Sequence, residues 1–122
     1  MRIIAGDLKG RRLASPKDER VRPTSDKVKE AVFSMIFDSC YDKTVIDLFA
    51  GTGNLGIEAI SRGARHCYFG DKSKESLALI RENVNACGVQ DKSTIIAGDY
   101  ELVLKRVPQK AQVIFLDPPY RD

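Results

Sequence analysis

The sequence predicts an α/β fold in which a parallel β-sheet is flanked by crossover helices. Short apolar runs alternate with amphipathic segments of helical period along the 122 residues, a pattern typical of strand–helix–strand units. The apolar run 45–49 leads directly into a glycine-rich turn and then into a helical pattern. No repeat or low-complexity tract interrupts the chain, and the polar stretch 15–22 is its one linker-like segment. A single domain is therefore expected.

An arm and a helix are the first predicted elements. Residues 1–22 are rich in basic side chains and are expected to form a short hairpin or arm. Pro23 precedes a hydroxyl cap and an acid, which indicates that a helix begins near Thr24 and continues to about residue 37. Apolar residues follow the i, i+3, i+4 spacing of a helix at Val28, Ala31, Val32, Met35 and Ile36.

Strands and helices then alternate. Gly63 and Gly88 are expected to end the second and third helices, Ser73 to cap the third, and Pro108 to break the fourth. Because each strand is followed by a helix, neighbouring strands should run parallel. The predicted elements are strand 45–49, helix 55–62, strand 66–69, helix 74–87, strand 94–97, helix 100–107 and strand 112–116.

A glycine loop after the first strand predicts a nucleotide-like ligand. Gly51, Gly53 and Gly56 match the G-x-G-x-x-G spacing, in which the missing side chains let the backbone turn tightly and approach a ligand at a helix N-terminus. This spacing alone is a weak signal. Asp71 strengthens it, because this acid ends the next strand eighteen residues after Gly53, about where a ribose-binding carboxylate belongs.

Asp47 favours S-adenosylmethionine over a dinucleotide. It lies within the strand just before the loop, where a carboxylate would repel a pyrophosphate but could accept hydrogen bonds from the ammonium of a methionyl group. The alternative is that Asp47 caps backbone amides of the loop. Asp99, after the apolar run 95–97, could bind the adenine amino group, or it forms a turn or a helix N-cap.

The most informative motif is Asp117-Pro118-Pro119-Tyr120, directly after the apolar run 113–116. The exocyclic amine of a nucleobase has its lone pair delocalised into the ring, so its methylation requires acceptors for the N–H groups and an aromatic face for the base. The Asp117 carboxylate, the Pro118 carbonyl and the Tyr120 ring could supply both. The alternative is a rigid turn after a strand. Together with the glycine loop, the motif favours a methylation site.

On these residues the chain resembles the bacterial methyltransferases that modify guanine N2 in small-subunit (16S) ribosomal RNA. The resemblance spans essentially the whole chain, and the combination of motifs is more specific than any one of them. The matching segments are Met1-Arg2-Ile3-Ile4-Ala5-Gly6, Gly10-Arg11-Arg12-Leu13, residues 21–31, residues 47–59 and residues 117–120.

The resemblance implies a Rossmann-like class I methyltransferase fold, with S-adenosyl-L-methionine as cofactor. The chain would supply the N-terminal half of the family's parallel sheet, in the order 3-2-1-4, together with the basic arm. Asp117, Pro118 and Tyr120 would be the catalytic residues that bind guanine. The acid after the second strand is usually Glu in such enzymes and is Asp71 here, so a water could bridge it to the ribose. Phe49 could line the cofactor pocket or pack beneath the sheet. The predicted cofactor-binding residues are Thr24, Ser25, Asp47, Phe49, Ala50, Gly51, Gly53, Asp71, Lys72, Asp99 and Tyr100.

Basic charge is concentrated at the N-terminus. Residues 1–29 carry nine Lys or Arg against four acids, whereas residues 30–122 carry eleven against thirteen. Such a basic segment could track a phosphate backbone, although a charged run is often a solvated face. Ribosomal RNA or the small ribosomal subunit is therefore the expected partner. The predicted RNA-binding residues are Arg2, Lys9, Arg11, Arg12 and Arg22.

The end of the chain raises a second expectation. Asp122 follows the Asp-Pro-Pro-Tyr motif by two residues, whereas members of the family continue further. Strand 112–116 would then form an apolar edge and is expected to mediate dimerisation or aggregation, and the missing half of the sheet could leave the chain inactive.

No membrane or secretory segment is predicted, so a cytoplasmic location is expected. The spacing of Cys40, Cys67 and Cys87 suits buried, reduced thiols, and no metal site is predicted.

The predicted reaction is direct in-line transfer of the sulfonium methyl to guanine N2, without a covalent enzyme intermediate. Three alternatives stay open. A DNA adenine-N6 or protein-glutamine methyltransferase would use a similar motif, often with Asn in its first position. A nicotinamide-dependent oxidoreductase shares the glycine loop but leaves residues 117–120 unexplained. A half-domain could also bind the cofactor without turnover.

Overall fold

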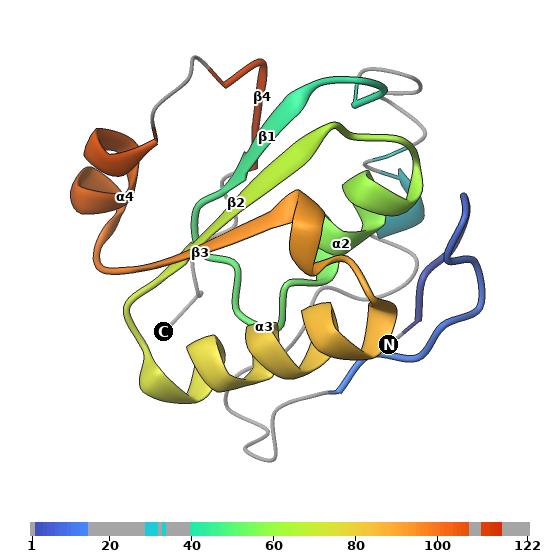
Figure 1. Ribbon diagram of the computed structural model, residues 1–122, viewed down its shortest axis with the longest axis horizontal. Coiled ribbons are helices and arrows are strands. Elements are labelled where there is room, and N and C mark those ends of the chain that lie inside the picture. The colour runs from blue at the N-terminus through green and yellow to red at the C-terminus, as the bar shows by residue number, and fades with distance from the viewer. Residues whose placement is uncertain (1, 15–28, 32, 34–39, 108–110, 116–122) are drawn as a thin grey trace.

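The computed structural model describes residues 2–14, 29–31, 33, 40–107 and 111–115. At its centre lies a four-stranded parallel sheet in the order β3-β2-β1-β4, which confirms the predicted order (Figure 1). The helices and strands are β1 (Thr44–Asp47), α2 (Asn54–Ser61), β2 (His66–Asp71), α3 (Lys74–Cys87), the 3-10 helix η1 (Gln90–Lys92), β3 (Ser93–Ala97), α4 (Tyr100–Arg106) and β4 (Val113–Phe115).

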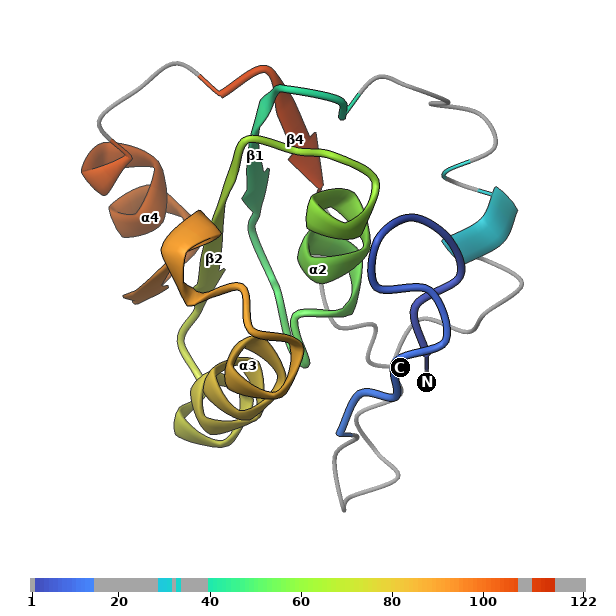
Figure 2. The same cartoon turned by 45° about the vertical axis from the view of Figure 1, so that its right-hand side comes forward.

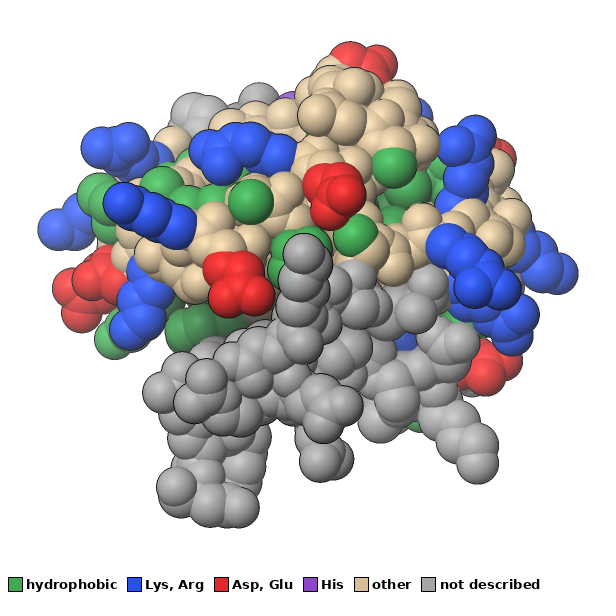
Figure 3. Space-filling view, turned by 90° about the horizontal axis from the view of Figure 1, so that it is seen from below, with side chains coloured by type: hydrophobic (Ala, Val, Ile, Leu, Met, Phe, Trp, Pro, Cys, Tyr) green, Lys and Arg blue, Asp and Glu red, His purple; other side chains and the backbone are tan. Residues whose placement is uncertain are grey.

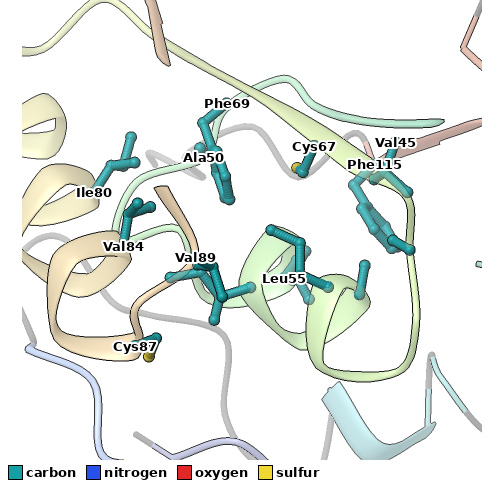
Figure 4. Close-up of a cluster of buried hydrophobic side chains, with 14 of the residues drawn as sticks. Val45, Ala50, Leu55, Cys67, Phe69, Ile80, Val84, Cys87, Val89 and Phe115 are labelled. Atoms are coloured by element: carbon teal, nitrogen blue, oxygen red, sulfur yellow. The ribbon is translucent and has the colours of Figure 1, made fainter. Parts of the chain in front are cut away.

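Helices cover both faces of the sheet. Helices α2 and α3 lie on one face and α4 lies on the other (Figure 1). Because side chains alternate along a strand, Val45 of β1 packs in the core beneath α2 and α3, whereas Ile46 packs in the smaller core beneath α4. Figure 4 shows side chains of the larger core, with Phe69 and Phe115 reaching from the sheet toward the two helices.

Local signals account for the helix ends. Ser73 caps α3, since its hydroxyl oxygen accepts a hydrogen bond from the Ser76 N–H, and Gly88 ends the helix in the left-handed region at φ 66°. Both predictions are confirmed. Helix α2 begins one residue earlier than expected, after Gly53 at φ 82°, and α4 ends at Arg106 rather than at residue 107.

The strand boundaries correct several predictions. Strand β1 ends at Asp47 rather than at residue 49, because the chain already turns into the glycine loop after this residue. Strand β2 continues to Asp71, two residues further than predicted, since its pairing with β3 extends to Ala97. Strand β3 begins one residue early, and η1 was not predicted. Most of the predicted helix 24–37 lies outside the described residues, but residues 29–31 and 33 are helical.

The N-terminal arm, residues 2–14 in the described part of the chain, lies beside α2 (Figure 2). An isolated antiparallel bridge joins Arg2 to Arg12, so the arm is a docked loop rather than a regular β-hairpin. Ile3 and Leu13 are buried in the larger core. Ser61 of α2 holds the middle of the loop, because its hydroxyl donates to the Ala5 carbonyl at 2.6 Å. Folding therefore fixes the arm on the body of the domain.

Two glycines of the arm offer a matched test of this docking. Gly6 and Gly10 have nearly the same φ, 86° and 87°. A Cβ at Gly6 would lie 1.9 Å from the Ser61 carbonyl oxygen, whereas a Cβ at Gly10 would meet no atom of the described residues within 4 Å. Both Ala substitutions carry the strain of a left-handed residue, and Gly6→Ala adds overpacking. In urea unfolding, Gly6→Ala should be the more destabilising variant by about 1 to 3 kcal/mol. Equal losses would mean that the loop shifts freely.

Strand β4 forms an edge of the described sheet, since among the described strands it pairs with β1 alone. Its Ile114 side chain is 48% exposed. An exposed apolar edge is a template for pairing with another strand. Dimerisation through residues 112–116 nevertheless stays a prediction. None of the helices described is long and apolar enough to cross a membrane.

Candidate functional site

The carboxyl ends of the strands meet at one edge of the sheet, as they must when all strands are parallel. Asp47 ends β1, Asp71 ends β2, and Asp99 follows β3 by two residues. The glycine loop, residues 48–53, crosses the same edge. The catalytic residues predicted after β4, namely Asp117, Pro118 and Tyr120, lie outside the described residues, as do Thr24, Ser25 and Arg22.

The glycine loop is held over the end of β2. Ala50 donates its N–H to the Gly70 carbonyl at 2.9 Å, and Gly51 donates its N–H to Asp71 Oδ2 at 3.0 Å. Gly51 and Gly53 both have positive φ values, which explains why this loop needs glycine at these positions. Among the described residues, the nearest atom to a Cβ at Gly51 would be the Phe49 carbonyl oxygen at 3.9 Å. Within the described part of the chain, no side chain therefore packs against the backbone at Gly51.

Asp71 joins the glycine loop to the start of α3. Its Oδ2 accepts from Gly51, and its Oδ1 accepts from the Ser73 N–H at 2.9 Å. The two oxygens of a carboxylate offer about four lone-pair sites in total. Asp71 therefore keeps acceptor capacity for hydroxyl groups of a ligand while it fixes the loop. The side chain is partly exposed, as a ligand-binding carboxylate at this edge requires.

Unlike Asp71, which binds the glycine loop, Asp47 faces α2. It is 2% exposed, and its Oδ2 accepts the Gly56 N–H at 3.0 Å. Asp47 thus binds a backbone amide in the first turn of α2, where a negative charge is favourable. The sequence left open that Asp47 caps backbone amides of the loop. The structure shows such a contact, but the amide, that of Gly56, belongs to α2 rather than to the loop. Contact with a methionyl ammonium stays a prediction.

Asp99, Phe49 and Tyr100 lie near one another at the end of β3. Asp99 is the N-cap of α4, because its Oδ1 accepts the Leu102 N–H at 2.9 Å. The predicted alternative of a helix N-cap is therefore confirmed, and the contact of Asp99 with adenine stays a prediction. The rings of Phe49 and Tyr100 are 6.5 Å apart between centroids. Phe49 is half-buried against the core beneath α4. Its packing therefore matches the alternative in which this ring lies beneath the sheet. Tyr100 is 50% exposed, and Lys72 is exposed beside Asp71.

A buried charge network behind the glycine loop was missed by sequence reasoning. Lys29 and Glu58 both have fully buried side chains, 3.1 Å apart between Nζ and Oε1. Lys29 also donates to the Arg2 carbonyl at 2.5 Å and to Asn54 Oδ1 at 2.6 Å. Glu58 accepts from Arg62 Nε at 2.9 Å. The signal in the sequence was an acid at position 58 within the apolar face of a helix.

Asn83 was also missed. This buried side chain of α3 contacts both the end of the arm at Ala14 and the glycine loop at Thr52. The sequence signal was a polar residue between Ile80 and Val84, which line the buried face of the helix. Lys29, Glu58 and Asn83 together connect the arm to the segment that carries the predicted cofactor site.

The cysteine thiols are free and buried, as predicted. Burial raises the pKa of each of the three thiols above its ordinary value. For Cys67 the nearby Asp47 carboxylate raises the pKa further. A thiolate is the nucleophilic form of cysteine, so Cys67 is held in its unreactive form. Among the described residues no group of three or more His, Cys, Asp or Glu side chains could hold a metal ion.

The described basic residues of the arm, Arg2, Lys9, Arg11 and Arg12, are exposed. Seen from below, Lys and Arg side chains lie toward both ends of the molecule, and one group is at the right-hand end, where the arm lies in Figure 1 (Figure 3). Arg11 is anchored there, because its Nη1 donates to the Ala86 carbonyl of α3 at 3.1 Å. The arm therefore presents cations from a fixed position.

Known proteins match the whole chain. A protein family described as "Conserved hypothetical protein 95" matches residues 1–122. The chain is 38% identical to "Putative rRNA methyltransferase YlbH" of Bacillus subtilis, over 100% of the chain and 68% of that protein. It is 33% identical to "Ribosomal RNA small subunit methyltransferase D" of Haemophilus influenzae, over 98% of the chain and 64% of that protein. It thus spans about two thirds of the length of these relatives.

A solved structure confirms the predicted fold class. "Putative methyltransferase yhhF from Escherichia coli" superposes with a TM-score of 0.85 at 27% identity, over 99% of this chain and 65% of that one. The likeness, together with the observed strand order, makes the fold a Rossmann-like class I methyltransferase fold.

Proposed function

The chain belongs to the family described as Conserved hypothetical protein 95, and from this premise we propose that it methylates guanine N2 in small-subunit ribosomal RNA with S-adenosyl-L-methionine as methyl donor. The observation that carries the proposal is that Asp71 holds the glycine loop at the carboxyl edge of the sheet, the edge at which Asp47 ends β1 and Asp99 follows β3. The names of the relatives, which refer to rRNA and small-subunit rRNA, support the choice of substrate.

The residues at this edge suit the proposed cofactor. Asp71 retains acceptor capacity for the ribose hydroxyls, and none of the described side chains packs against the backbone at Gly51. The buried Asp47 places negative charge beside the loop, which favours a cationic methionyl group over a pyrophosphate. Asp99 would accept from the adenine amino group through Oδ2, since Oδ1 caps α4. The bound cofactor would supply a methyl group that its sulfonium has already activated.

The remaining task of the chain would be to hold the guanine amine. Asp117 and the Pro118 carbonyl would accept hydrogen bonds from the N2 amine and stabilise the positive charge that develops on its nitrogen. Tyr120 would stack on the base. In the net reaction the carbon–sulfur bond breaks, a carbon–nitrogen bond forms and the amine loses one proton. The buried, protonated thiols described above would take no part.

Nucleoside analysis of the product tests the proposal. The chain is incubated with small-subunit ribosomal RNA and methyl-labelled S-adenosylmethionine, and the RNA is digested to nucleosides. Label in N2-methylguanosine is the expected result. In a parallel incubation with DNA, label in N6-methyl-2′-deoxyadenosine would instead favour the adenine alternative. Binding of the cofactor without label in either nucleic acid would identify a half-domain that lacks turnover.

A further inference from the structure

Asn83 connects two segments that are far apart in the sequence. Its side chain is 1% exposed. Its Oδ1 accepts the Ala14 N–H at 2.6 Å, and its Nδ2 donates to the Ala14 carbonyl at 3.1 Å and to the Thr52 carbonyl at 2.8 Å. All three partners are backbone groups. One carboxamide therefore fixes the end of the arm and the glycine loop at Thr52 at once.

The other end of the arm is tied to the same region. Lys29 donates to the Arg2 carbonyl in the arm and to Asn54 Oδ1 in the first residue of α2. Glu58 of α2 accepts the N–H groups of Ile4 and Ala5 at 2.8 and 3.1 Å. Since α2 begins directly after the glycine loop, both ends of the arm are bonded to the segment that shapes the loop.

Buried polar groups are costly to leave without partners. If the arm left its place, Asn83 and Glu58 would each lose acceptor or donor partners on the arm, and the bonds that remain to Thr52 and within α2 would be free to shift. If the loop moved, the Thr52 carbonyl would leave Asn83. Each segment is thus most stable when the other one is in place.

We propose that Asn83 is a positioning residue that couples docking of the N-terminal arm to the glycine loop, so that a ligand on the loop and a docked arm stabilise each other. The proposal rests on the proposed function for the identity of the ligand. Because such coupling is reciprocal, cofactor binding would hold the arm and its exposed cations in place for RNA. The arm in turn would pre-organise the loop for the cofactor.

Calorimetric titration with S-adenosylhomocysteine tests the coupling from the side of the loop. Asn83→Leu removes the three hydrogen bonds at similar volume, and Asn85→Leu is its matched control on the exposed face of the same helix. Asn83→Leu should weaken binding at least about fivefold, whereas Asn85→Leu should leave it unchanged. Circular dichroism and urea unfolding confirm that each variant is folded during the titration. Equal affinities for a folded Asn83→Leu variant and the wild type would overturn the coupling.

Hydrogen exchange tests it in the wild-type chain, without any substitution. The Ala14 N–H, which donates to Asn83, should exchange more slowly when S-adenosylhomocysteine is bound, even though Ala14 belongs to the arm. Slower exchange at the Gly51 N–H with no change at Ala14 would overturn the coupling and leave the proposed cofactor site intact. A folded wild-type chain that does not bind S-adenosylhomocysteine would overturn the proposed function, and the coupling with it.

Discussion

Replacing Glu58 by Ala should lower the free energy of unfolding by about 3 to 5 kcal/mol. The substitution removes the Glu58 carboxylate from its ion pair with the fully buried Lys29 ammonium, and breaking a buried ion pair by removing one member is strongly destabilising. It also removes the acceptor for the N–H groups of Ile4 and Ala5. The loss is measured by urea unfolding followed by circular dichroism.

Two further variants isolate the cause of that loss. Glu82→Ala removes an exposed glutamate of α3 and should change stability by no more than about 0.5 kcal/mol. Adding Lys29→Met to Glu58→Ala also removes the buried ammonium and should recover part of the stability, since apolar replacement of both members of a buried pair is often tolerated. A Glu58→Ala variant as stable as Glu82→Ala would show that the network contributes nothing.

Replacing Asp117 by Ala should abolish methylation while sparing cofactor affinity. In the proposed reaction Asp117 stabilises charge that develops on the guanine nitrogen, and removal of one such group costs about 100-fold to 1000-fold in rate in enzymes where it has been measured. The proposed cofactor site lies on the loop and on the ends of β1, β2 and β3, so S-adenosylhomocysteine binding should not change. Methyl transfer to RNA and calorimetric titration give the two readouts.

The matched control is Asp91→Ala, which removes an exposed acid in η1 and should alter neither readout. An Asp117→Ala variant that loses rate and affinity to the same extent would place Asp117 in the cofactor site or in the folding core. A variant with an unchanged rate would return the Asp-Pro-Pro-Tyr motif to the status of a rigid turn.

Features set by neighbours in the sequence were predictable. Helix α3 has the predicted boundaries because a serine cap and a left-handed glycine fix its two ends. The strand order was predictable from the family resemblance, and the crossover pattern dictates parallel pairing. Strand β1 was predicted too long, since the apolar residues Leu48 and Phe49 continue its pattern although the backbone there has already entered the loop.

Features set by distant contacts were not predictable. Nothing in the sequence pairs Lys29 with Glu58 or Asn83 with Ala14, because charged and amide side chains are mostly exposed and their burial depends on how the arm docks. Likewise, the need for glycine at position 6 follows from the close approach of Ser61, a residue 55 positions away in the sequence. Asp71 and Asp99 of the candidate site were found because each follows an apolar run, and Asp47 was found because it lies within one just before the glycine loop.

Calorimetric titration of the chain with S-adenosylhomocysteine tests most directly whether the carboxyl edge of the sheet is a cofactor site. We expect saturable binding with a Kd of about 1 to 100 micromolar, equivalent to roughly −8 to −5.5 kcal/mol. Binding should be lost in a folded Asp71→Ala variant and should be absent for NADH. A folded wild-type chain that does not bind S-adenosylhomocysteine, or an Asp71→Ala variant that binds it as tightly as the wild type, would contradict the account.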